Sequence, residues 1–206
     1  MKAVSQYCVS KFSQQLVTCI GLSLALSSAQ AQLGMVIGGD SFAAACYRAS
    51  SIAISNGSAS RRDLEPCQRA IYDGALSRKN LVASYVNRGA IYMALGDRKS
   101  ALNDFNLALD LDDKTGEAYV NRGNLWFFGN DLPKALSDYD LALQLGVEKP
   151  HIAHLNRGMA RERLGKLGEA QADYQASLSY AANWSEAALR LTRVTEKIRQ
   201  KNRERK

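Results

Sequence analysis

Two histidines, His151 and His154, come closest in type and spacing to the residues of a metal or catalytic site. They stand three positions apart, so on a helix both would lie on one face and could share a zinc ion. A zinc site needs three or four ligands, and no cysteine or carboxylate cluster accompanies them. No Ser-His-Asp order, phosphate-binding loop or paired-carboxylate motif occurs in a supporting context. These observations predict a protein that is not an enzyme and has no metal or cofactor.

The first 31 residues have the features of an export signal. Two lysines precede an apolar run at residues 16–26, which is too short to span a membrane because a spanning helix needs about 20 residues. Ala29 and Ala31 are the small residues that a signal peptidase accommodates, so we expect cleavage after Ala31. The mature chain would begin at Gln32 and would be periplasmic or secreted.

Removal of this leader would leave two of the four cysteines, Cys46 and Cys67. In an oxidising compartment such a pair is read most simply as one disulfide, whereas in a reducing cytosol it would more often be two buried thiols. Because the leader predicts export, we favour the disulfide. Cys19 is not expected to be a lipoprotein anchor, because Thr18 precedes it and the apolar run continues past it.

The triplet Asn-Arg-Gly occurs three times, and its glycines, Gly89, Gly123 and Gly158, are 34 and 35 residues apart. A turn glycine recurs with a similar step, at Gly96, Gly129 and Gly165. Twelve residues after each triplet glycine comes an alanine, then an aspartate three further on, then an aromatic residue: Ala101, Asp104 and Phe105; Ala135, Asp138 and Tyr139; Ala170, Asp173 and Tyr174. A fixed period of this length indicates stacked helical repeats.

This register resembles that of the tetratricopeptide repeat family, whose unit has 34 residues. The middle unit resembles the family pattern best, with Tyr119, Gly123, Trp126, Ala135, Tyr139 and Ala142. The third departs from it, with His154 and Arg161 in the aromatic places and Ser177 for the last alanine. The resemblance implies an all-α fold: a right-handed α-solenoid of antiparallel helix pairs with a C-terminal capping helix.

The sequence divides into a signal peptide (1–31), a degenerate N-terminal hairpin (32–81), three repeat units (82–115, 116–149 and 151–184) and a basic capping helix with its tail (185–206). In the N-terminal hairpin, Cys67 takes the place of the repeated alanine, because it lies 34 residues before Ala101. We expect one helix from about Ser41 to Ile54 and another from near Asp63. The expected disulfide would therefore join the two helices of the weakest unit.

The stacked first helices of the family line a concave groove, so the resemblance implies which residues contact a partner. The predicted contact residues are Asn87, Asn121, Asn156, Val86, Val120, Asn124, Phe127, Phe128 and Leu155. An amide donates and accepts, so the column of repeated asparagines could hold an extended backbone, or each could bond only to a neighbouring helix. The implied partner is a protein or peptide, whose identity the sequence does not give, just as it does not give the oligomeric state.

Each repeated arginine stands sixteen residues before a repeated aspartate, which predicts an ion pair between the two helices of each unit: Arg88 with Asp104, Arg122 with Asp138, and Arg157 with Asp173. We interpret these pairs as structural, although arginines left unpaired at a groove could also receive acidic partners.

Most of the positive charge lies at the C-terminal end. The formal net charge is +7, and residues 190–206 contain eight basic residues against Glu196 and Glu204. This segment could bind an anionic polymer or lipid, but a charged chain end is more often a solvated cap, and export argues against nucleic acid. The sequence thus predicts a non-catalytic exported adaptor that binds a protein or extended peptide; the alternative is an envelope accessory module anchored by its basic C-terminal helix.

Overall fold

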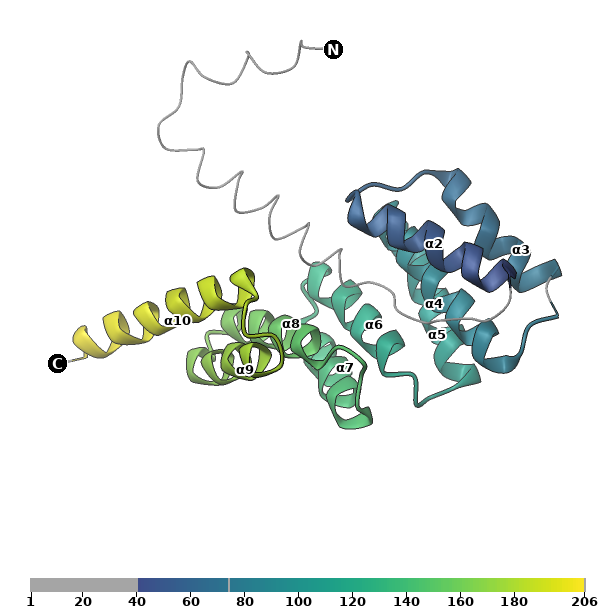
Figure 1. Ribbon diagram of the computed structural model, residues 1–206. Helices are drawn as coiled ribbons and strands as arrows, with labels where there is room; N and C mark the ends of the chain where they lie inside the picture. The colour runs from purple at the N-terminus through teal and green to yellow at the C-terminus, as the bar shows by residue number, and fades with distance from the viewer. Residues whose placement is uncertain (1–40, 74, 206) are drawn as a thin grey trace, which may run out of the picture.

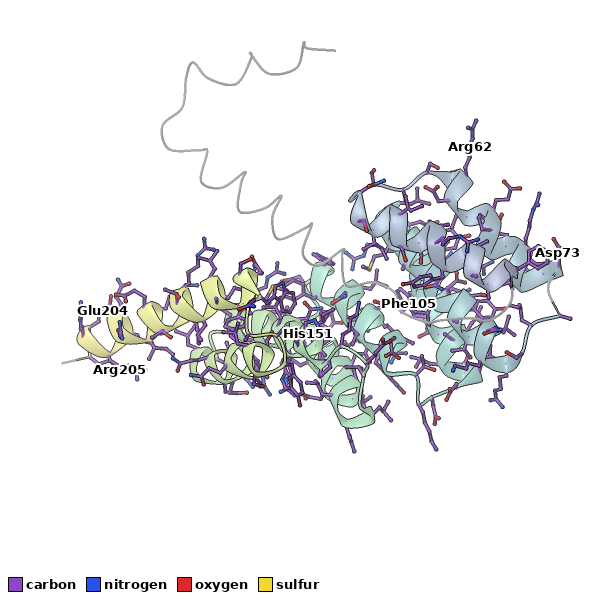
Figure 2. The ribbon with its side chains drawn as sticks, in the orientation of Figure 1. Arg62, Asp73, Phe105, His151, Glu204 and Arg205 are labelled. Carbon is purple, nitrogen blue, oxygen red and sulfur yellow. A yellow bond between two sulfur atoms is a disulfide. The ribbon has the colours of Figure 1, made fainter. Side chains whose placement is uncertain are left out.

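The computed structural model describes residues 41–73 and 75–205 of the 206-residue chain. The predicted leader and its cleavage site lie outside the described residues. Within them the fold is all-α, and the helices stack as hairpins from α2 at one end of the molecule to α10 at the other (Figure 1). Arg62 and Asp73 lie at the first end, and Glu204 and Arg205 at the far end of α10 (Figure 2). The predicted all-α solenoid is confirmed.

The three repeat units correspond to three antiparallel helix pairs. These are α4 (Arg78–Ala94) with α5 (Arg98–Leu111), α6 (Gly116–Phe128) with α7 (Leu132–Leu145), and α8 (Pro150–Arg163) with α9 (Leu167–Tyr180). The first helices of successive units contact one another, α4 against α6 and α6 against α8. The last helix, α10 (Ser185–Arg203), packs on α9 and covers the apolar end of the stack with Ala187 and Val194, both fully buried.

Short turns join the helices of each pair. Asp97 and Asp131 begin α5 and α7, and the side chain of each accepts a hydrogen bond from a backbone N–H three residues later, which satisfies a free donor of the first helical turn. Gly96 and Gly165 adopt positive φ angles of 78° and 73°, as a residue that reverses the chain after a helix must.

The expected turn glycine of the second unit, Gly129, lies in the turn as the C-cap of α6, but it is not the residue with the left-handed conformation. Its φ is −79°, and the residue with positive φ is Asn130 at 62°. Asparagine tolerates the left-handed conformation better than other residues with a side chain, so the turn can form without a glycine at that place. Gly129 is therefore a turn glycine, as expected, and Asn130 supplies the positive φ angle of this turn.

The glycine of each Asn-Arg-Gly triplet lies directly under the repeated aromatic ring of its own unit. A Cβ atom at Gly123 would lie 2.7 Å from Cε1 of Tyr139, and one at Gly158 would lie 2.7 Å from Cε1 of Tyr174. Phe105, labelled in Figure 2, stands over Gly89 in the same way. All three rings are fully buried, so the absence of a side chain at the glycine lets the two helices of each unit approach closely.

The N-terminal hairpin consists of α2 (Ser41–Ser55), a 3₁₀ turn η1 (Arg61–Leu64) and α3 (Glu65–Asp73). Cys46 on α2 and Cys67 on α3 are joined by a disulfide, and both are fully buried. The cysteines belong to a small core that also includes Ala53, Ala70 and Ile91. Since Ile91 belongs to α4, this core attaches the degenerate hairpin to the first complete repeat.

Candidate functional site

The three predicted arginine–aspartate pairs are present and connect the two helices of each unit. Arg88 donates to both carboxylate oxygens of Asp104 at 2.7 and 2.8 Å, and Arg122 to those of Asp138 at 2.9 and 2.8 Å. Arg157 contacts Asp173 at 2.6 Å. The three aspartates are buried, so these pairs serve the packing of each hairpin and leave no aspartate free to act on a ligand.

The same arginines also join neighbouring units. Arg122 donates to Oδ1 of Asn106 in the first unit at 2.9 Å, and Arg157 donates to Oδ1 of Asp140 in the second unit at 2.7 Å. Arg88 has three tyrosine rings around it instead, and its guanidinium carbon lies between 5.5 and 5.9 Å from their centroids: Tyr72, Tyr85 and Tyr92. The arginines therefore support the stacking on which any groove depends.

The third unit departs from the repeat pattern because its aromatic places are used for charge. His154 Nδ1 lies 3.3 Å from Asp173 Oδ1, and Arg161 lies 2.7 Å from Asp173 Oδ2. Burial by itself would raise the pKa of Asp173. The hydrogen bonds from His154 and Arg157, with the charges of Arg157 and Arg161, more than offset burial, and the pKa is lowered. Asp173 is thus an ionised structural centre.

The two histidines are not arranged as a metal site. His151 packs edge-on against Trp184, with ring centroids 5.1 Å apart, and burial followed by the charge of Lys149 lowers its pKa. His154 stacks on Tyr180. In residues 41–73 and 75–205 no group of three or more His, Cys, Asp or Glu side chains is placed to hold a metal ion.

The nine predicted contact residues share the row formed by α4, α6 and α8, but eight of them are buried: Asn87, Asn121, Asn124, Asn156, Val86, Val120, Phe127 and Leu155. Only Phe128 is exposed, at 37%. The expectation of an open apolar groove at the eight positions is wrong with respect to exposure. The reason is that the first helices pack directly on one another. Val86 of α4 packs in one apolar cluster with Ala118 of α6, and Val120 of α6 packs in another with Ile152 of α8.

The three repeated asparagines do not behave alike. Asn87 Oδ1 accepts a hydrogen bond from Ser50 of α2 at 3.3 Å, and Asn156 Nδ2 donates to Asn124 Oδ1 at 2.8 Å. Asn124 Oδ1 also accepts from the hydroxyl of buried Tyr139 at 2.8 Å. Asn87 and Asn156 thus follow the local alternative, in which an amide bonds to a neighbouring helix.

Asn121 is the exception. Among the described residues neither its Oδ1 nor its Nδ2 has a hydrogen-bond partner, although the side chain is 1% exposed. Asn124 Nδ2 and Asn156 Oδ1 are unpaired in the same part of the chain. A buried polar group without a partner costs about 1–3 kcal/mol, so these amide atoms are the part of the row with unused hydrogen-bonding capacity.

The end of the row contains charged side chains that the sequence analysis did not single out. Glu162 accepts from the hydroxyl of Tyr174 at 2.7 Å and from Nζ of Lys197 at 2.5 Å, which fixes α10 to α8. Arg163 donates to the carbonyl oxygen of Phe127 at 3.2 Å. Glu162 and Arg163 follow Asn156 by six and seven residues on α8, and this position on a first helix could have identified them from the sequence.

Part of the charge of the basic helix α10 contributes to this docking. Lys197 pairs with Glu162 of α8, whereas the pairs of Arg190 with Glu186 at 2.6 Å and of Arg199 with Glu196 lie within α10. The segment therefore acts as the cap that closes the stack. No helix between residues 41 and 205 is both long and apolar enough to cross a bilayer.

The tetratricopeptide repeat pattern matches residues 82–115 and 152–183, which are the first and third units. Residues 116–151, which include the second unit, lie between the two matches. A search of curated proteins found no match.

Solved structures with a similar fold include two tetratricopeptide repeat domains and one further protein. The first such domain of Spaghetti (RPAP3), bound to the HSP90 peptide SRMEEVD, has 27% identity and a TM-score of 0.54, over 57% of this chain and 92% of that chain. The second domain of human RPAP3, in complex with the HSP70 peptide SGPTIEEVD, has 23% identity and a TM-score of 0.54, over 58% and 98%. Pseudomonas aeruginosa pilF has 16% identity and a TM-score of 0.64, over 78% and 72%.

Proposed function

Because two of its three repeat units match the tetratricopeptide repeat pattern, we propose that the chain is a non-catalytic adaptor, exported from the cytoplasm, that binds an extended segment of a partner protein along α4, α6 and α8. The observation that carries the proposal is the unpaired amide of Asn121. An amide can accept from a backbone N–H and donate to a backbone C=O, so a partner strand could satisfy both atoms at once.

The residues on either side of Asn121 indicate the chemistry of that partner. The neighbouring first helices present Val86 from α4 and Leu155 and Met159 from α8, all apolar and buried. The two chaperone peptides in the similar structures both end in EEVD, which combines three acidic residues with an apolar valine. We infer that the partner segment of this protein places apolar side chains beside Asn121 and that binding involves a local opening of the α6–α8 row.

Replacing Asn121 by leucine is the direct test of this proposal. Since the amide has no partner in the described residues, an apolar side chain of similar size should leave the free energy of unfolding unchanged or raise it. The matched variant Asn87→Leu should lower it by about 1 kcal/mol, because it removes the hydrogen bond from Ser50. Both values can be measured by urea unfolding.

Binding is read in the same variants by photo-crosslinking in living cells. The probe, benzoylphenylalanine, replaces exposed Phe128, and a control protein has it at Tyr72, which is 73% exposed on α3. We expect one protein adduct from Phe128 that Asn121→Leu abolishes and that Tyr72 does not give. Equal adducts from both positions, or a product without added mass, would remove the case for an external partner at this row.

Export is tested by the mass of the mature protein. We expect a chain that begins at Gln32, because cleavage after Ala31 fits the leader. A cellular protein that retains residues 1–31 would contradict the location in the periplasm or outside the cell.

A further inference from the structure

The first helix of the described chain, α2, has an apolar stripe that the described elements leave exposed. The stripe consists of Phe42, Ala45, Ala49 and Ile52, which follow one another at steps of three, four and three residues and therefore lie along one side of the helix. Phe42 is 42% and Ile52 is 59% exposed, and the two alanines between them are half-buried. We call this surface the α2 stripe.

The α2 stripe is separate from the face by which α2 joins the stack. In the part of the chain that the structure describes, α2 packs mainly against η1, α3 and α4. These contacts bury Ala43, Cys46, Ser50 and Ala53, which lie on a neighbouring side of the helix. The α2 stripe is therefore free for a further element.

The two ends of the solenoid differ in this respect. At the C-terminal end, α10 covers the last repeat with Ala187 and Val194, and the rest of its sequence is rich in charged side chains. A solenoid needs a polar surface at each end to stay soluble. At the other end, where α2 lies (Figure 1), two large apolar side chains remain at the surface. This end thus lacks a cap among the described residues.

A second copy of the chain could cover the α2 stripe, but the stripe is too small for a stable dimer. An aromatic side chain offers about 150–250 Å², so the exposed parts of Phe42 and Ile52 together offer about 200 Å². A stable interface buries about 800 Å² on each partner. The neighbouring exposed residues of α2, Arg48 and Ser55, are polar and do not extend the apolar surface. The area therefore favours an occupant that is already attached to the chain.

The residues immediately before α2 have the composition of such an occupant. Residues 32–40 lie outside the described residues, and their sequence contains no charged side chain before Asp40. Leu33, Met35 and Ile37 alternate with other residues, so in an extended segment they would share one face. Because the segment is covalently joined to α2, its effective concentration at the stripe is on the order of millimolar, and a small contact area is enough.

The lengths of the segment and the stripe also agree. From Leu33 to Ile37 an extended chain covers about 13 Å. From Phe42 to Ile52 the helix covers about 15 Å. Residues 38–39 are both glycine, which adopts positive and negative φ angles about equally readily, so they can reverse the chain. Reversal would bring Ile37 beside Phe42 and Leu33 beside Ile52.

We propose that residues 33–37 pack in an extended conformation on the α2 stripe, antiparallel to the helix, and cap the N-terminal end of the solenoid. The expected cleavage after Ala31 would leave only Gln32 in front of this segment. The inference uses no residue of the row formed by α4, α6 and α8, so its failure would leave the proposed function standing.

Replacing Ile37 with serine tests the packing in the full chain purified from cells. Because Ile37 would contact Phe42, the change should lower Tm by about 2–5 °C in calorimetry. The matched control is Val36→Ser, on the opposite face of the extended segment, which should change Tm by less than about 1 °C. In a Phe42→Ser protein the effect of Ile37→Ser should largely disappear, because the shared contact is already lost. Equal shifts from the Val36 and Ile37 variants, or no shift from either, would overturn the proposal.

Photo-crosslinking in the same purified chain locates the segment independently of stability. Benzoylphenylalanine in place of exposed Ile52 should form an intrachain link to residues 33–35, identified by mass spectrometry of the digested monomer. In place of Phe42 it should link to residues 36–37. This order of links is specific to antiparallel packing, and the opposite order would contradict it.

The control position for crosslinking is Tyr72, which is 73% exposed on α3 and lies beside Arg88 of α4. A probe there should give no link to residues 32–37. A product of twice the chain mass that increases with protein concentration would show that a second copy covers the α2 stripe. The absence of any link from Ile52 and Phe42 to residues 33–37 would show that the segment lies elsewhere, and either result overturns the proposal.

Discussion

Replacing Asp104 with alanine is expected to lower the free energy of unfolding by about 3–5 kcal/mol, because it leaves the guanidinium of Arg88 buried without its counterion. The side chains of the pair are 7% and 2% exposed. Burial by itself would lower the pKa of Arg88. The hydrogen bonds and the charge of Asp104 more than offset burial and raise the pKa of Arg88 above its usual value, so Arg88 stays charged in the pair. For a protein of this size the expected loss of Tm is roughly 10 °C, which calorimetry would show.

The control for this experiment is Asp140→Ala. Asp140 also pairs with an arginine, but it is 55% exposed and Arg157 keeps Asp173 as a partner, so the expected loss is at most about 1 kcal/mol. A double variant, Arg88→Met with Asp104→Leu, should recover most of the stability because no unpaired charge remains. Equal losses for Asp104→Ala and Asp140→Ala would mean that burial of the pair has no energetic importance.

Removing the disulfide is expected to cost about 3 kcal/mol, with the effect concentrated in α2 and α3. Cys46 and Cys67 close a loop of 21 residues, and the chain-entropy estimate for a loop of that length is about 3 kcal/mol. The N-terminal hairpin lies at the end of the stack and attaches to it through α4, so it lacks the second neighbour that stabilises an internal unit.

Hydrogen exchange followed with and without a reductant measures this effect. Amides of α2 and α3 should exchange at least about 100-fold faster on reduction, while those of α8 and α9 should change little. In a Cys46→Ala, Cys67→Ala protein the reductant should have no effect, which controls for its action elsewhere. Uniform acceleration along the whole chain would show instead that the solenoid unfolds as one cooperative unit.

The periodicity of the sequence was sufficient to predict the helix pairs. The step of 34 or 35 residues placed glycine, aspartate and aromatic residues in register, and the three buried pairs of arginine with aspartate followed from a constant spacing of sixteen. These features depend on contacts between two helices separated by one short turn. Because such a turn leaves few possible arrangements, spacing along the chain determines distance in space.

The state of the asparagines could not be predicted in this way. Asn87, Asn121 and Asn156 occupy the same place in the repeat, yet the first bonds to Ser50, the third bonds to Asn124, and the second has no partner among the described residues. Which of them is left unpaired depends on the side chain that the adjacent unit brings near, and that residue is not part of the repeated pattern.

Exposure and charge balance depend on tertiary structure for the same reason. Val86 and Leu155 are buried because α4, α6 and α8 pack side by side, and Glu162 is paired because α10 brings Lys197 to it. Local spacing thus sets the fold of each hairpin. The packing of one hairpin on the next, between residues about 30 positions apart, decides which groups remain available to a partner.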